Sequence, residues 1–193
     1  MAGMYNLIKN GDLAGVQRAV QDDPALLNAT LTTKKYTPLM WALHPESGVH
    51  PAISLWLVEQ GANLDLRTND RWTALMLACR YDQPGTAQLL IQRGAKLDLQ
   101  DNEGWTALML ACRYDQPGTA QLLIQRGAKL DLQEVDGCTT LMWACRYDQP
   151  DTARLLIERG AKLDLQNNNG WTALMLACRY GQPGTASCSS SAV

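Results

Sequence analysis

The sequence contains no phenylalanine and only two histidines, His44 and His50, among its 193 residues. The two histidines stand in one short stretch, with no constellation of cysteines or carboxylates at metal-ligand spacing, so we expect no metal site. The patterns G-x-x-x-x-G-K-[ST], G-x-S-x-G and H-E-x-x-H are also missing. We therefore expect no catalytic residue, no cofactor and no enzyme activity.

An excess of charge of either sign is missing as well. The chain has 17 lysines and arginines against 19 aspartates and glutamates, a formal net charge of -2. This balance disfavours nucleic acid as a partner, because nucleic-acid-binding domains usually carry a basic patch. No apolar run is long enough to span a bilayer, and the N-terminus does not resemble a signal peptide. We expect no membrane contact and an intracellular location, cytoplasmic or nuclear.

The dominant feature that is present is an internal repeat with a period of 33 residues. The segment from Trp72 to Gln100 recurs unchanged from Trp105 to Gln133. A unit this short cannot bury its own apolar face, so the copies must stack and share a continuous core. A further copy occupies residues 138–166, and another begins at Trp171. An earlier copy begins at Tyr36 and contains three extra residues within His44–Val49.

Each copy predicts two short helices and an extended hairpin. In TALMLACRY a threonine caps the first helix, and Asp82 ends it. Pro84 opens the second helix, and Gly94 ends it. The stretch AKLDLQDNEG alternates apolar and polar residues before a glycine, which is typical of a hairpin. The equivalents of Asp82 in the later copies are Asp115, Asp148 and Gly181, the last a residue suited to a left-handed turn.

This pattern resembles the ankyrin repeat family, whose signature is G-x-T-P-L-H-x-A-A followed by G-H and L-L-x-x-G-A. Thr37-Pro38-Leu39, Leu89-Leu90 and Gly94-Ala95 carry the resemblance together with the period. The resemblance implies an all-α fold, an ankyrin-repeat solenoid of stacked helix-turn-helix units with hairpin loops. It also implies a division into an N-terminal capping repeat at 1–35, repeats at 36–70, 71–103, 104–136 and 137–169, a truncated repeat at 170–186 and a disordered tail at 187–193.

The sequence departs from the family pattern in three ways. Asp-Gln replaces Gly-His in the later copies, although His50 occupies the family's histidine position in the first full copy. The last copy loses most of its second helix and has no evident polar cap, so we expect that this end could self-associate. Methionine replaces the histidine of T-P-L-H, so apolar packing must substitute for the hydrogen bonds that this histidine makes. The methionines are Met40, Met76, Met109, Met142 and Met175.

Four cysteines, Cys79, Cys112, Cys145 and Cys178, recur at the repeat spacing. Equivalent helices of stacked repeats lie about 8–10 Å apart, whereas a disulfide requires Cα atoms within about 7 Å. We therefore predict buried, reduced thiols that pack as small apolar groups.

Aromatic and basic residues recur at positions that line a concave groove in ankyrin proteins. The hairpin tips vary most between copies, and in this family such tips often set specificity: Asn69, Asp70, Asn102, Glu103, Glu134, Val135, Asn168 and Asn169. Tryptophan, tyrosine and arginine are enriched at binding hot spots. The predicted site comprises Trp72, Trp105 and Trp171 before the capping threonines, and the pairs Arg80-Tyr81, Arg113-Tyr114, Arg146-Tyr147 and Arg179-Tyr180 at the ends of the first helices.

The favoured function is a non-catalytic scaffold that binds a peptide or protein surface, with an acidic partner favoured by the arginines. Single-stranded nucleic acid or a nucleotide is one alternative, because single strands stack on aromatic residues beside arginines. A duplicated or engineered repeat protein without a dedicated ligand, and a fragment of a longer ankyrin protein, are others. In a purely structural interpretation, arginine caps helix carbonyls or pairs with Asp82-type residues, and tryptophan packs against the next hairpin. Ser191-Ala192-Val193 fits a loose PDZ-ligand pattern.

Overall fold

The computed structural model describes residues 2–182 and 184–185. The chain forms two compact units, residues 1–96 and 97–193. Throughout the described residues the regular elements are helices, and the hairpins contain no β-strand. The fold is therefore all-α, as predicted. The predicted disordered tail at 187–193, the Ser191-Ala192-Val193 pattern and the end of the predicted truncated repeat lie outside the described residues.

The first unit begins with a helix pair and continues with two helix-turn-helix repeats. Asp12 caps the second helix of the pair, because its carboxylate accepts a hydrogen bond from the Gly15 N–H at 2.8 Å. That helix ends at Asp22. The elements are α1 (Ala2–Lys9), α2 (Leu13–Asp22), the 3-10 helix η1 (Pro24–Asn28), α3 (Pro38–Ala42), the 3-10 helix η2 (Pro45–Ser47), α4 (Pro51–Glu59), α5 (Ala74–Arg80) and α6 (Pro84–Gln92).

The three extra residues of the first full copy form the 3-10 turn η2. His44 caps this turn, since its Nδ1 accepts the Glu46 N–H at 3.3 Å. The His44 ring also stacks on Trp41, with centroids 5.4 Å apart, and burial lowers the pKa of His44. His50 bonds through Nε2 to the Ser47 carbonyl at 2.6 Å. Both histidines thus hold the insertion in place.

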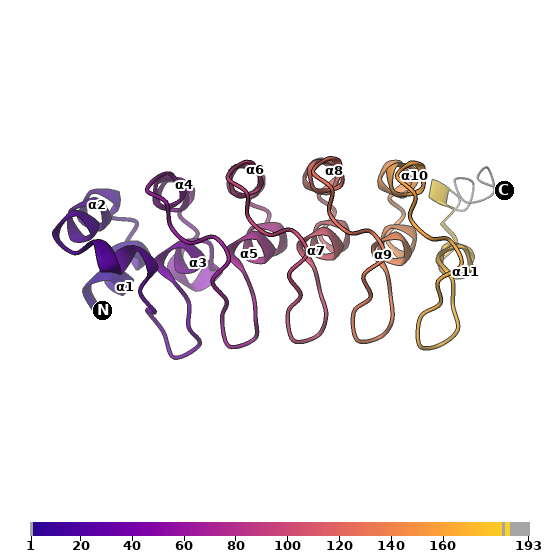
Figure 1. The fold of residues 1–193 in the computed structure, drawn as a ribbon, viewed down its shortest axis with the longest axis horizontal. Coiled ribbons are helices and arrows are strands. Elements are labelled where there is room, and N and C mark those ends of the chain that lie inside the picture. The colour runs from indigo at the N-terminus through magenta and orange to yellow at the C-terminus, as the bar shows by residue number, and fades with distance from the viewer. Residues whose placement is uncertain (1, 183, 186–193) are drawn as a thin grey trace. The chain divides into compact units, whose positions relative to one another are not determined.

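The second unit stacks two complete helix pairs and one further first helix. Its elements are α7 (Ala107–Arg113), α8 (Pro117–Gln125), α9 (Thr140–Arg146), α10 (Pro150–Glu158) and α11 (Ala173–Arg179). Helix α9 packs against both α7 and α11. Within this unit the second helices α8 and α10 lie along one side of the first helices, and the hairpins project from the other (Figure 1). The hairpins therefore lie next to the ends of the first helices and leave the second helices on a separate face.

Threonine begins each first helix of the second unit, as the sequence predicts. The Met109 N–H donates to Thr106 Oγ1 at 3.2 Å, and the Met142 N–H donates to Thr139 Oγ1 at 3.4 Å. The chain leaves these helices through a left-handed residue, with φ of 53° at Asp115. An aspartate tolerates this conformation better than most side chains, because its short carboxylate can bond locally.

The core consists of apolar side chains from the first helices together with the inward faces of the second helices, such as Leu90 and Leu123. Met109 and Met142 are at most 1% exposed, so apolar packing has replaced the family's histidine. Cys79, Cys112 and Cys145 are buried free thiols, as predicted. The prediction was wrong for Cys178, which is an exposed free thiol, because no described helix covers its face of α11.

In the second unit, carboxylates link each hairpin to the next. The Lys129 N–H donates to Asp98 at 2.8 Å, and the Lys162 N–H donates to Asp131 at 3.0 Å. Gln133 Nε2 donates to the Gln166 carbonyl at 3.1 Å. These bonds cross from one repeat to the following one, so they fix the spacing of the hairpins that flank the candidate site.

Candidate functional site

In the first unit, one arginine lies over a tryptophan where a hairpin meets a first helix. The Cζ atom of Arg80 is 5.0 Å from the Trp72 ring centroid and 5.6 Å from that of Tyr81. Arg80 is exposed, while Trp72 and Tyr81 are half-buried. The Trp72 backbone N–H donates to Thr68 Oγ1 at 3.1 Å, which fixes the backbone that carries the indole. The structure thus brings these three predicted site residues together.

The first Arg–Trp stack of the second unit joins Arg113 to Trp105, with Cζ 4.9 Å from the ring centroid. Tyr114 lies beside them, its centroid 5.9 Å from the same Cζ atom. Tyr114 is 38% exposed, but Trp105 is only 6% exposed. Trp105 is therefore a support beneath Arg113, and the surface available to a partner here is the arginine and the tyrosine.

The next arginine, Arg146, has no tryptophan before its capping threonine, because Cys138 occupies that position. It lies instead over Trp143 from its own helix, at 5.3 Å, and over Tyr180 from the following repeat, at 5.1 Å. Tyr147 stacks on Trp143 with centroids 5.9 Å apart and is 41% exposed. Trp143 is a member of the site that sequence reasoning missed.

A signal for Trp143 was present in the sequence. In copies that lack tryptophan before the capping threonine, a tryptophan replaces a leucine inside the helix, at Trp41 and Trp143. The structure shows why this exchange is tolerated. The Trp143 ring reaches back to Trp105, with centroids 4.7 Å apart, so an indole fills the space between two repeats from a different backbone position.

The last stack joins Arg179 to Trp171, with Cζ 4.8 Å from the ring centroid. Trp171 is half-buried, Arg179 is exposed, and Tyr180 is 42% exposed. The second unit thus presents three consecutive arginines that each lie over an indole.

Stacking holds each guanidinium in place without using its hydrogen-bonding edge. A cation over an aromatic ring gains about 0.5–1 kcal/mol at an exposed site, and the N–H groups in the guanidinium plane remain able to grip a carboxylate. Within the described residues, Arg113, Arg146 and Arg179 form no salt bridge. The predicted structural alternative, in which these arginines pair with Asp115-type carboxylates, is not what the structure forms.

A single side chain at the base of each hairpin organises the turn. Asp101 Oδ1 accepts the N–H groups of Glu103 and Trp105, both at 2.9 Å. Asn167 Oδ1 does the same for Asn169 and Trp171, at 3.0 and 2.9 Å. Because one acceptor serves both the hairpin tip and the tryptophan, it sets the tryptophan's position. Burial raises the pKa of Asp101, although the N–H groups act in the opposite direction.

The predicted specificity tips are exposed, with one exception. Glu134 is 5% exposed, and its carboxylate accepts hydrogen bonds from the N–H groups of Asp136 and Cys138, at 2.8 and 3.0 Å. It occupies the same anchoring position as Asp101, so its carboxylate is used inside the turn and is not part of the exposed tip. Val135 beside it is 60% exposed.

The structure also bears on metal binding and on membrane contact. In the part of the chain that it describes, no three histidine, cysteine, aspartate or glutamate side chains gather to hold a metal ion. No helix of that part combines the length and hydrophobicity needed to cross a bilayer.

Comparison with known proteins supports the repeat architecture. The family model described as ankyrin repeats (3 copies) matches residues 4–101, 46–134, 82–167 and 116–187. No curated protein matches the sequence. Among solved structures, the chain is similar to a chain in the complex of Bd0816, a predatory endopeptidase from Bdellovibrio bacteriovorus, with the immunity protein Bd3460. The two share 32% identity with a TM-score of 0.82, over 99% of this chain and 98% of that chain.

Proposed function

Because the chain belongs to the ankyrin repeat family, we propose that it is a non-catalytic scaffold that binds a protein partner. The binding surface comprises the arginines and tyrosines that end the first helices, together with the exposed hairpin tips beside them. The partner is a peptide or a folded protein surface. A cytoplasmic or nuclear location is part of the same proposal.

One observation carries this proposal. Arg113, Arg146 and Arg179 are exposed, held over aromatic rings and free of salt bridges among the described residues. A charged side chain that is already immobilised loses little conformational entropy on binding, and arginine and tyrosine dominate binding hot spots. Helix-capping or solubility alone would not require that each guanidinium lie over an indole.

The solved relative supports a protein as the partner. It comes from a complex between an endopeptidase and an immunity protein. An endopeptidase is therefore the first class of partner to test for this chain, and a displayed library of peptides is the unbiased complement.

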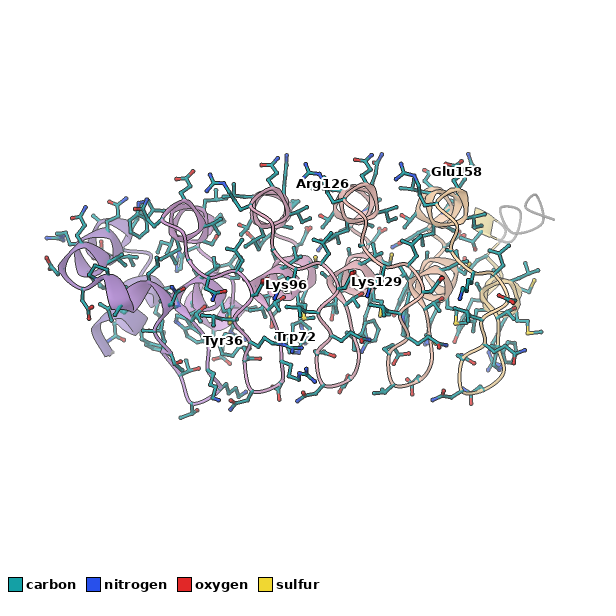
Figure 2. All side chains as sticks on the ribbon, in the orientation of Figure 1. Tyr36, Trp72, Lys96, Arg126, Lys129 and Glu158 are labelled. Carbon is teal, nitrogen blue, oxygen red and sulfur yellow. The ribbon has the colours of Figure 1, made fainter. Side chains whose placement is uncertain are left out.

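The test compares two triple variants that reverse the same amount of charge. In one, Arg113, Arg146 and Arg179 become glutamate. In the matched control, the arginines at the ends of the second helices, Arg93, Arg126 and Arg159, become glutamate. Within the second unit, Arg126 lies with Glu158 on the second-helix side, away from the hairpins (Figure 2).

Peptides and endopeptidases that bind the wild-type chain should bind the first variant at least tenfold more weakly, because each lost hot-spot arginine costs about 1–2 kcal/mol. The control should bind within about threefold of the wild-type chain, since rim charges contribute little. Circular dichroism confirms that both variants are folded. Equal binding by the first variant and the wild-type chain, or no enrichment of any peptide or protein, would overturn the proposal.

A further inference from the structure

The second unit contains a pocket of about 460 Å³ between α9, α11 and the hairpin that joins their repeats. Arg146 and Arg179 line it together with the rings of Trp143, Trp171 and Tyr180. It therefore lies within the proposed binding surface, at the place where two of the three Arg–Trp stacks meet.

The pocket carries positive charge without compensation from its own walls. Of the described residues that line it, two are arginines and none is an aspartate or glutamate. Arg146 and Arg179 are also the last residues of α9 and α11, so the negative ends of two helix dipoles lie beside them. A singly charged carboxylate suits this balance better than a doubly charged phosphate, because the helix ends offset part of the arginines' charge.

Trp143 forms part of the pocket wall and is 6% exposed. Its indole N–H is buried and has no hydrogen-bond partner among the described residues. The indole therefore contributes an aromatic surface to the pocket and not a hydrogen-bond donor that a ligand can reach.

The remaining walls are apolar. Met142 and Leu176 line the pocket, and its volume exceeds that of one carboxylate group. Leu176 occupies the position at which Trp143 fills the space against the preceding repeat. The smaller leucine thus explains why room remains here, and the apolar walls provide a place for a second side chain of the ligand.

We infer that this pocket binds an acidic residue of the partner, aspartate or glutamate, with an apolar side chain next to it in the sequence. The carboxylate lies between the edges of Arg146 and Arg179, and the apolar side chain packs on Met142 and Leu176. This inference rests on the proposed function and identifies the chemistry that the scaffold recognises.

The test uses a displayed library of peptides with amidated C-termini, so that side chains supply the only carboxylates. Peptides enriched by the wild-type chain should share aspartate or glutamate beside leucine, methionine or an aromatic residue. Changing that glutamate to glutamine should weaken binding about tenfold, because an ionic hydrogen bond is lost. A phosphoserine in its place should bind more weakly than glutamate.

A pocket-filling variant tests the location without changing charge. Leu176→Trp copies the arrangement of the preceding repeat, where Trp143 packs on Trp105, and leaves both arginines in place. It should abolish the preference for the acidic residue. Arg126→Glu on the second-helix face should retain the preference.

The outcomes separate the two proposals. Peptides that are enriched without an acidic residue, that bind Leu176→Trp as well as the wild-type chain, or that prefer phosphoserine would overturn this inference and leave the scaffold function standing. If the library enriches no peptide and no endopeptidase binds, both fail.

Discussion

Helices α7 and α11 have the same sequence, ALMLACR, and lie in the same unit, yet their surroundings differ. Leu108 of α7 is 1% exposed, while its counterpart Leu174 of α11 is 41% exposed. Met109 is fully buried, while Met175 is 48% exposed. The difference arises because α9 covers this face of α7, whereas no described helix covers the same face of α11.

What the two helices share is equally informative. Threonine caps both, with the Met109 and Met175 N–H groups donating at 3.2 and 3.4 Å. An arginine lies over a tryptophan in both, at 4.9 and 4.8 Å. The cap, the helix bounds and the Arg–Trp stack therefore belong to the repeat itself. The burial of its side chains depends on the neighbouring repeat, as expected for proteins whose repeats contact only the adjacent ones.

The largest effect should come from truncating the leucine that differs most between the two helices. Leu108→Ala should lower the free energy of unfolding by about 2–5 kcal/mol, because it leaves a cavity in a packed core. Leu174→Ala removes a side chain that is already 41% exposed and should cost less than about 1 kcal/mol. Urea titrations followed by circular dichroism measure both. Equal losses would mean that α11 is covered in solution.

A thiol at equivalent positions offers a second contrast. Cys178 is exposed, whereas Cys112 is 0% exposed. In the native protein a thiol reagent should therefore modify Cys178 at least about 100-fold faster than Cys112, because the thiolate must be accessible to react. In the first unit, burial raises the pKa of the equivalent Cys79 to about 12, so Cys79 should also react slowly.

The labelling is read by mass spectrometry of tryptic peptides, in which the hairpin residues distinguish Cys112 from Cys178. A Cys188→Ser background keeps the C-terminal cysteine from contributing. Urea should equalise the rates. Rapid labelling of Cys112 without denaturant would contradict the packing of α9 on α7.

The sequence was enough to predict the all-α repeat fold, because the features responsible are local. Threonine caps, left-handed residues at Asp115 and Gly127, and the 33-residue period all act within one repeat or between neighbours. The buried thiol at Cys178 was predicted wrongly for the opposite reason, since its burial depends on a neighbouring repeat.

The candidate site was predicted in composition but only partly in geometry. The Arg-Tyr pairs lie at the surface, as expected from their place at helix ends. The roles of Trp105 and Glu134 could not be read from one sequence, since burial of the indole depends on Trp143 of the next repeat and the carboxylate is used inside its own turn. The period alone does not reveal such contacts between unlike residues.

The smallest expected effect concerns the hairpins that precede α7 and α11, which differ at their anchor, Asp101 against Asn167. Asp101→Asn keeps the acceptor oxygen for the Glu103 and Trp105 N–H groups, so stability at neutral pH should change by less than about 0.5 kcal/mol. Asp101→Ala leaves two N–H groups without a partner and should cost about 1–2 kcal/mol. Urea titrations of the two variants separate these cases.

The pH dependence distinguishes the charged anchor from the neutral one. Burial raises the pKa of Asp101 above its usual 3.8, so in this range the folded chain binds more protons at this site than the unfolded chain. Its contribution to stability is then greatest below the usual pKa and falls as the pH rises through the raised value. The wild-type chain should lose stability relative to Asp101→Asn over the interval in which the pH rises from the usual pKa to the raised one. A difference that is flat across this interval would show that the N–H groups offset burial and that the two hairpins are electrostatically alike. A difference of the opposite sign would show that the N–H groups outweigh burial.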